Sequence, residues 1–125
     1  FGTVPPAPIL AIADAIRFHQ SIGIKNIEAR LRTLSQYWLA QVRHFRRVKI
    51  HTPSDPRRYC AIAAFSIEGI SAQEVIQFLM REHKIFTVVR KIGDMEVVRV
   101  TPHLCTSKAA LDQLAFAISS LCDSY

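Results

Sequence analysis

Two arginines in the second half of the chain have the type and spacing needed to bind a carboxylate. Arg90 lies in one β-rich run and Arg99 in the next. Gly93 and Asp94 stand between the runs as a two-residue loop suited to a type II′ hairpin. The register of that hairpin places both arginines on one face, as diagonal neighbours roughly 7 Å apart. The rest of this face is apolar: Val88, Ile92, Met95 and Val97.

Two neighbouring guanidinium groups require an anion, because neither can lose its proton to relieve the repulsion between them. The planar fork of an arginine matches a carboxylate through two parallel hydrogen bonds, so a bound ligand is one source of that anion. The other source is an acidic side chain of the chain itself, and the candidates are Glu68, Glu82 and Glu96. Geometry alone leaves both sources open.

The first part of the sequence predicts two helices. Pro5, Pro6 and Pro8 suit a helix start, where the missing N–H groups cost nothing. Apolar residues then recur at helical spacing from Ile9 until Gly23. A longer helix follows, and its apolar stripe consists of Ile24, Ile27, Leu31, Leu34, Trp38 and Val42. The length of this second helix indicates that the rest of the domain packs along it.

The remaining sequence mixes strands and helices without strict alternation. Strands are predicted over residues 48–51, 59–65, 86–92 and 95–101. A capping box of Ser71 and Glu74 opens a helix that runs to about His83, and Thr106 or Ser107 caps a last helix. The predicted order is α-α-β-β-α-β-β-α. It indicates an α+β fold with a small, mainly antiparallel sheet and helices on one face.

Composition limits the class of protein. The 125 residues fit one domain, 1–125, and the sequence is 50% hydrophobic and 21% charged, which is typical of a globular chain. No apolar run approaches the roughly 20 residues of a membrane span. Cys60, Cys105 and Cys122 are widely spaced and odd in number, which argues against a disulfide framework and against a metal site. A reducing cytoplasmic location is therefore expected.

The net charge of +6 raises the question of nucleic-acid binding. The densest basic stretch covers residues 43–49, and Arg57 and Arg58 lie a little further on. A solvated helix end explains such a stretch, because cations suit a helix C-terminus. Nucleic-acid binding would instead need these residues to form one stripe, and we favour the solvated helix end.

Several short motifs are spread along the chain. They are Gly2-Thr3 ahead of Ile9, Ile22-Gly23, Val88-Val89-Arg90, Val98-Arg99-Val100-Thr101-Pro102-His103, Thr106 and Leu111-Asp112. Considered together, they resemble the C-terminal third of class V aminotransferase-type enzymes, which use pyridoxal phosphate and have fold type I. The branch that the chain resembles most is the isopenicillin N epimerase-like proteins. The start at Phe1, without a Met, fits a cut inside a longer protein.

The resemblance implies roles for four residues. Arg99 matches the arginine that grips the substrate's α-carboxylate, and Arg90 matches a second arginine that reaches the active site. Gly2 and Thr3 match a pair that meets the cofactor phosphate across a dimer interface. An ordinary helix N-cap before the prolines is the alternative role for Thr3. The implied partners are an N-terminal cofactor-binding domain joined through residues 1–22, an amino-acid substrate and a second copy in a homodimer.

The resemblance also implies that the reaction chemistry lies elsewhere. The family's cofactor-binding lysine is upstream, next to a histidine. His83-Lys84 imitates that pair, but it lies at a predicted helix end and too late in the chain, so we reject it. This chain alone therefore holds no catalytic residue and is not expected to catalyse a reaction. The implied parent is an epimerase, lyase or aminotransferase.

Cysteine desulfurases of the family carry a nucleophilic cysteine between the two arginine segments. Here Gly93 and Asp94 close that gap without a cysteine, which disfavours persulfide chemistry. Cys105 follows Arg99 and is predicted to be a small, partly buried thiol. His103 is expected to support the loop after Arg99. Two other function classes remain: a nucleic-acid-binding α+β module, and a regulatory module that senses a carboxylate without chemistry.

Overall fold

The computed structural model describes residues 5–124. Gly2 and Thr3, the predicted contacts of the cofactor phosphate, lie outside the described residues. The order of helices and strands is the predicted one. The elements are α1 (Pro6–Ile22), α2 (Ile24–Val42), β1 (Val48–Ile50), a short 3₁₀ turn (Pro56–Arg58), β2 (Ala63–Ile67), α3 (Ala72–His83), β3 (Val88–Ile92), β4 (Met95–Val100) and α4 (Lys108–Asp123).

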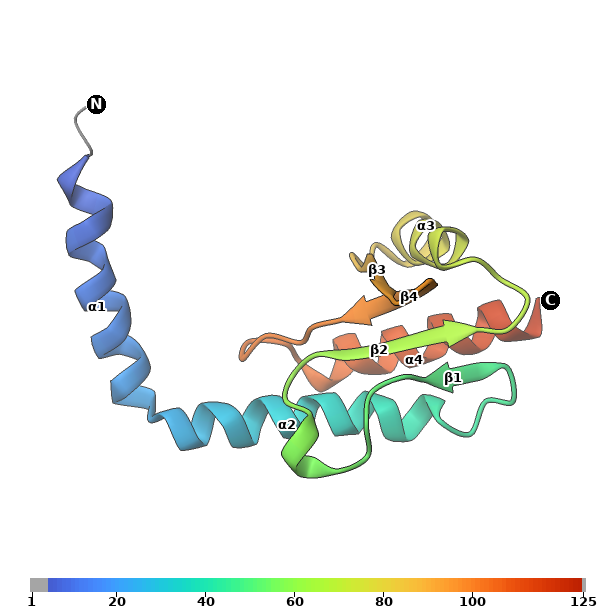
Figure 1. The fold of residues 1–125 in the computed structure, drawn as a ribbon, viewed down its shortest axis with the longest axis horizontal. Coiled ribbons are helices and arrows are strands. Elements are labelled where there is room, and N and C mark those ends of the chain that lie inside the picture. The colour runs from blue at the N-terminus through green and yellow to red at the C-terminus, as the bar shows by residue number, and fades with distance from the viewer. Residues whose placement is uncertain (1–4, 125) are drawn as a thin grey trace.

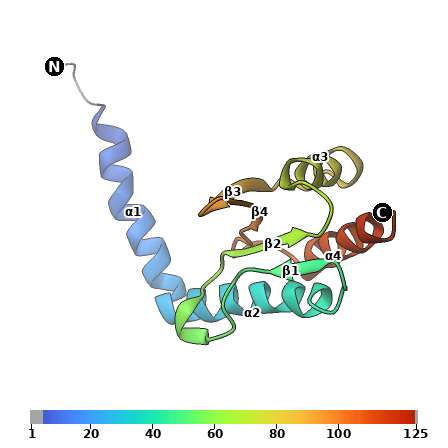
Figure 2. The ribbon, with the colours of Figure 1, turned by 45° about the vertical axis from the view of Figure 1, so that its right-hand side comes forward.

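The strands form one antiparallel sheet in the order β1-β2-β4-β3. Helices α2, α3 and α4 pack on one face of it, and the two views show α2 and α4 running side by side along the sheet (Figures 1 and 2). The predicted α+β class, the antiparallel sheet and the helices on one face are confirmed.

The core lies between the sheet and the helices. Along β2 the burial alternates with a period of two, so Ala63, Phe65 and Ile67 face the helices. Trp38 of α2 is fully buried, and its ring meets that of Phe65 edge-on with 5.9 Å between the centroids. The opposite face of the sheet has no helix over it within residues 5–124, and we call it the open face.

Capping determines where α3 begins and ends. The Ser71 hydroxyl accepts from the Glu74 N–H at 3.2 Å, and the Glu74 carboxylate accepts from the Ser71 N–H at 2.9 Å. The predicted capping box is thus confirmed. The helix ends at Lys84, which has a left-handed φ of 57°. Of the two residues predicted to cap α4, Ser107 is the one that accepts from the Ala110 N–H, at 3.1 Å.

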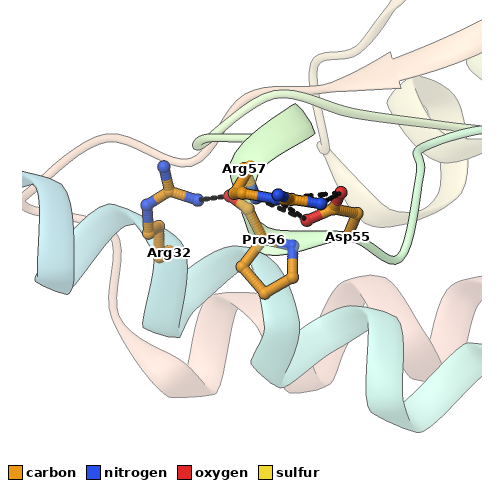
Figure 3. Close-up of polar contacts among 4 residues, drawn as sticks. All are labelled: Arg32, Asp55, Pro56 and Arg57. Atoms are coloured by element: carbon orange, nitrogen blue, oxygen red, sulfur yellow. Dashed lines mark hydrogen bonds and ion pairs between the residues drawn. The ribbon is translucent and has the colours of Figure 1, made fainter.

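The predicted bounds of one strand were wrong: β2 runs over Ala63–Ile67 and not over residues 59–65. Other interactions hold the segment before β2 away from the sheet (Figure 3). Arg32 of α2 donates to the carbonyl of Pro56 at 2.6 Å and also to that of Tyr59. Asp55 caps the 3₁₀ turn by accepting from the Arg57 N–H at 3.0 Å. The sequence does not reveal this constraint, because it depends on a distant helix.

Helix α1 projects away from the packed body (Figure 1) and has no buried residue. Gly23 forms the corner between α1 and α2 with φ at +87°, a conformation that residues with a side chain rarely adopt. Within residues 5–124, no helix combines the length and the apolar character needed to span a membrane.

Candidate substrate-binding face

The hairpin has the predicted register. Val88 pairs with Arg99, Arg90 with Val97, and Ile92 with Met95. Gly93 has φ at +60° and Asp94 does not have a positive φ, as a type II′ turn requires. Residues that pair directly point to the same side of a sheet, so Arg90 and Arg99 project from one face. That face is the open one, because Val89 and Val98 pack with the helices.

Arg99 has an unsatisfied hydrogen-bond donor. Its side chain is half-buried, and its Nε is buried without any acceptor among the described residues. A buried donor without a partner costs free energy, and more so when it belongs to a charged group. Arg90, in contrast, is exposed and donates to the carbonyl of its neighbour Val89, at 2.8 Å. The Nε–H of Arg99 can therefore donate a hydrogen bond to an acceptor on a ligand.

The acidic side chains considered as internal partners do not fill this role. Among residues 5–124 the ion pairs join Arg17 to Asp14, Arg32 to Glu28 and Arg57 to Asp55. None of them includes Glu68, Glu82 or Glu96. Glu96 pairs with Lys91 across the hairpin and therefore lies on the opposite face from the arginines. Within this part of the chain, the anion for Arg99 is not supplied by the fold.

Four residues that were not predicted as site residues share the open face with the arginines: Lys49, His51, Ala64 and Ser66. Ala64 of β2 pairs with Arg99, and the backbone N–H of His51 bonds to the Ala64 carbonyl at 2.9 Å. The His51 ring reaches Ser66, with 2.8 Å between Nε2 and Oγ. Lys49 pairs with Ser66. The polar Ser66 between the apolar Phe65 and Ile67 could have been noticed in the sequence, but its partners depend on the pairing of β1 with β2.

His51 has a lowered pKa, chiefly because partial burial disfavours the charged ring and also because Lys49 lies near it. The ring is therefore expected to be neutral at physiological pH. In the neutral form one ring nitrogen donates a hydrogen bond and the other accepts one, so the contact with Ser66 is available to either tautomer. His51 is thus a polar, uncharged group on the face that also carries Lys49 and Arg99.

The loop after β4 differs in one respect from expectation. His103 supports it as predicted: its N–H donates to Thr106 Oγ1 at 2.9 Å, and its Nδ1 accepts from the Cys105 N–H at 3.3 Å. Cys105 is exposed, so the prediction of a partly buried thiol was wrong. The loop holds its backbone with its own polar groups, which leaves this side chain facing outward. Lys84 lies at the end of α3 and donates to the Arg81 carbonyl at 2.9 Å.

The basic residues considered for a nucleic-acid interface lie near the middle and at the C-terminal end of α2, and one of them is paired with an acid. Arg57 is paired with Asp55 in the 3₁₀ turn, beside Arg32 (Figure 3). Arg43 caps the far end of α2. Arg43 lies eleven positions after Arg32, and this corresponds to roughly 16 Å along the helix axis. The binding of nucleic acid along one stripe therefore gains no support from this arrangement.

Comparison with known proteins agrees with the fold. The family model for aminotransferase class V matches residues 1–95, which is most of the chain. The chain belongs to the class V aminotransferase family. No curated protein matches the sequence.

Solved structures of other enzymes share the fold of this class V chain. The cysteine desulfurase of Thermococcus onnurineus NA1 superposes with a TM-score of 0.87 at 19% identity, over 99% of this chain and 33% of that one. The cysteine desulfurase CsdA of Escherichia coli gives 0.81 at 16%, over 95% and 31%. Catharanthus roseus tryptophan decarboxylase gives 0.69 at 14%, over 86% and 25%. The chain thus spans a third or less of the length of these structures.

Proposed function

We propose that the chain is the C-terminal part of a pyridoxal-phosphate enzyme that acts on an amino acid, and that Arg99 binds the α-carboxylate of the substrate. The observation that carries this proposal is the buried Nε of Arg99, which has no acceptor within residues 5–124. A carboxylate bound to a guanidinium accepts two parallel hydrogen bonds and neutralises the charge. Arg90, on the same face, would add a second donor for the substrate.

Family membership and a relative with glycine covalently linked to its cofactor indicate pyridoxal phosphate as the cofactor. This group withdraws electrons from the α-carbon of an amino acid joined to it. The residues of this chain would fix the substrate's orientation: with the carboxylate held by Arg99, rotation at the α-carbon is restricted and one bond is presented for cleavage. Gly2 and Thr3 are proposed to contact the cofactor phosphate from the chain's start.

The proposed parent contains an N-terminal cofactor-binding domain, and residues 1–22 form the connection to it. Two observations support this arrangement. The chain covers 33% of a structure with the same fold. Helix α1 carries large apolar side chains, Ile12, Ile16 and Phe18 among them, that are more than half exposed. We further propose a homodimer, in which Gly2 and Thr3 reach the partner's cofactor.

Among the reactions of the family, the hairpin favours an epimerase, lyase or aminotransferase over a desulfurase. Gly93 and Asp94 close the turn between the two arginines, and the free cysteines lie elsewhere. The isopenicillin N epimerase-like branch is proposed on the motifs around Arg99. The likeness to cysteine desulfurases, at 19% and 16% identity, reflects the fold.

The test of the carboxylate role is Arg99→Lys in the full-length parent. Lysine keeps the charge but loses the bidentate fork, so kcat/KM for amino acids should fall by about 100-fold. The visible absorbance of the bound cofactor should stay unchanged, since Arg99 is not proposed to hold it. Arg81→Lys on the exposed surface of α3 is the matched control and should leave both quantities unchanged. Unaffected turnover in Arg99→Lys would contradict the carboxylate role.

A further inference from the structure

The open face continues beyond Arg99 into a basic hollow of about 480 Å³. Ser66 and Lys49, which pair across β2 and β1, form its floor. The remaining lining residues are Arg46, Arg47, Val48 and Glu68. Three cations against one carboxylate leave the hollow positively charged. Arg47 directs its Nε to the backbone carbonyl of Glu68, at 3.2 Å, and not to the Glu68 carboxylate.

Strand register fixes the distance between this hollow and Arg99. Ala64 pairs with Arg99, so Ser66, two residues further along β2, is a diagonal neighbour of Arg99 at roughly 7 Å. Lys49 pairs with Ser66, so it lies two strand spacings from Arg99 and two residues further along, roughly 12 Å away. The small side chains of Ala64 and Ser66 lie between these two cations. The hydroxyl of Ser66 is oriented by the His51 ring, at 2.8 Å.

We infer that the enzyme's substrate carries a second anionic group, which Lys49 and Ser66 bind while Arg99 holds the α-carboxylate. This inference rests on the proposed function. A carbon chain with C–C bonds of about 1.5 Å, together with a hydrogen bond of about 2.9 Å at each end, covers the distance between the two cationic positions when the side chain has roughly three or more methylene groups. The substrate class is therefore an amino acid whose side chain ends in a carboxylate on such a chain. Shorter or uncharged side chains leave Lys49 without a partner.

Charge and hydrogen bonding both favour an anion over a neutral group in the hollow. Lys49 has only donors to offer, and an ammonium group gains most from an ionised acceptor. The Ser66 hydroxyl can donate to the same acceptor while it accepts from His51. Glu68 lowers the net charge of the hollow. It follows Ser66 along the chain, further from Arg99, and lies next to Arg47.

The test uses the full-length parent with its cofactor and two amino acids of matched length, L-2-aminoadipate and L-norleucine. Aminoadipate should be the better substrate. Lys49→Gln should raise the KM for aminoadipate about tenfold, with little change in kcat, because a charged hydrogen bond is lost from binding. The KM for norleucine should not change. Lys91→Gln is the matched control, since Lys91 lies on the same sheet but on its opposite face.

A second measurement does not depend on turnover. Adipate, which has two carboxylates and no amino group, should raise the Tm of the parent, and less so in Lys49→Gln, because a ligand that binds only the folded protein stabilises it. If the parent binds cofactor and uses both amino acids equally, or if adipate has no effect on Tm, the inference is wrong while the proposed function stands. A parent that binds no cofactor and uses no amino acid overturns both.

Discussion

At the scale of single residues, His51 links the open face to pH. Burial and the nearby Lys49 lower its pKa, so a proton binds more readily to the unfolded chain than to the folded one. The neutral His51 ring therefore leaves the folded state at its full stability above the ordinary histidine pKa of 6.5. Part of that stability is lost as the pH falls through the lower pKa of the folded state.

We predict that the free energy of unfolding decreases as the pH falls below about 6.5 and that His51→Gln reduces this decrease. Lys49→Gln should reduce it partly, because it removes the smaller cause of the pKa shift. Urea unfolding at a series of pH values measures the slope. An identical slope in His51→Gln and the wild-type chain would exclude His51 as the titrating group.

Arg99 and His51 show how far the sequence leads at this scale. A two-residue turn fixes the register of β3 and β4, so the common face of Arg90 and Arg99 could be predicted from the residues alone. The pairing of β1 with β2 spans a longer connection that includes the 3₁₀ turn, and no local rule fixes its register. The contact between His51 and Ser66 therefore required the folded structure.

At the scale of elements, local capping sets the ends of the helices. The reciprocal hydrogen bonds of Ser71 and Glu74 satisfy exposed N–H groups at the start of α3, and Ser71 lowers the pKa of Glu74. These contacts depend on residues three positions apart, and so this boundary was predictable. The start of β2 was not, because Arg32 of α2 holds the preceding segment.

Ser71→Ala is predicted to lower the free energy of unfolding by about 1 kcal/mol, since it removes a helix N-cap. Ser124→Ala is the control: the Ser124 hydroxyl donates to the Ser120 carbonyl at the end of α4 and caps no N–H group. Its effect should be within about 0.5 kcal/mol of zero. Urea denaturation of the chain measures both changes, and equal effects would refute the special contribution of the capping box.

At the scale of the whole molecule, α1 and the remaining elements contribute unequally to stability. The buried core is made by the sheet with α2, α3 and α4, whereas α1 contributes no buried residue. An apolar hollow lies in the angle between α1 and α2, lined by Ile12, Ile16 and Ile24 among others. Removing α1 therefore removes mostly exposed apolar surface.

Deletion of residues 1–22 is predicted to change the free energy of unfolding by less than about 1 kcal/mol and to reduce self-association of the chain. Leu34→Ala, at a fully buried position of α2, should by comparison cost about 2–5 kcal/mol. Denaturation and sedimentation velocity measure the two properties. A loss of cooperative unfolding on deletion would show that α1 is part of the folding unit.

The turn at Gly93 can change without disturbing the strands that carry Arg90 and Arg99. The space beside Gly93 is open, since an added Cβ would meet nothing within 4 Å. The cross-strand pairs begin with Ile92 and Met95, next to the turn, and the pairs that contain Arg90 and Arg99 lie further from it. An insertion at the turn therefore adds a loop beside the two arginines without changing their register. A nucleophilic side chain could therefore be engineered into this turn while the proposed carboxylate-binding arginines keep their places.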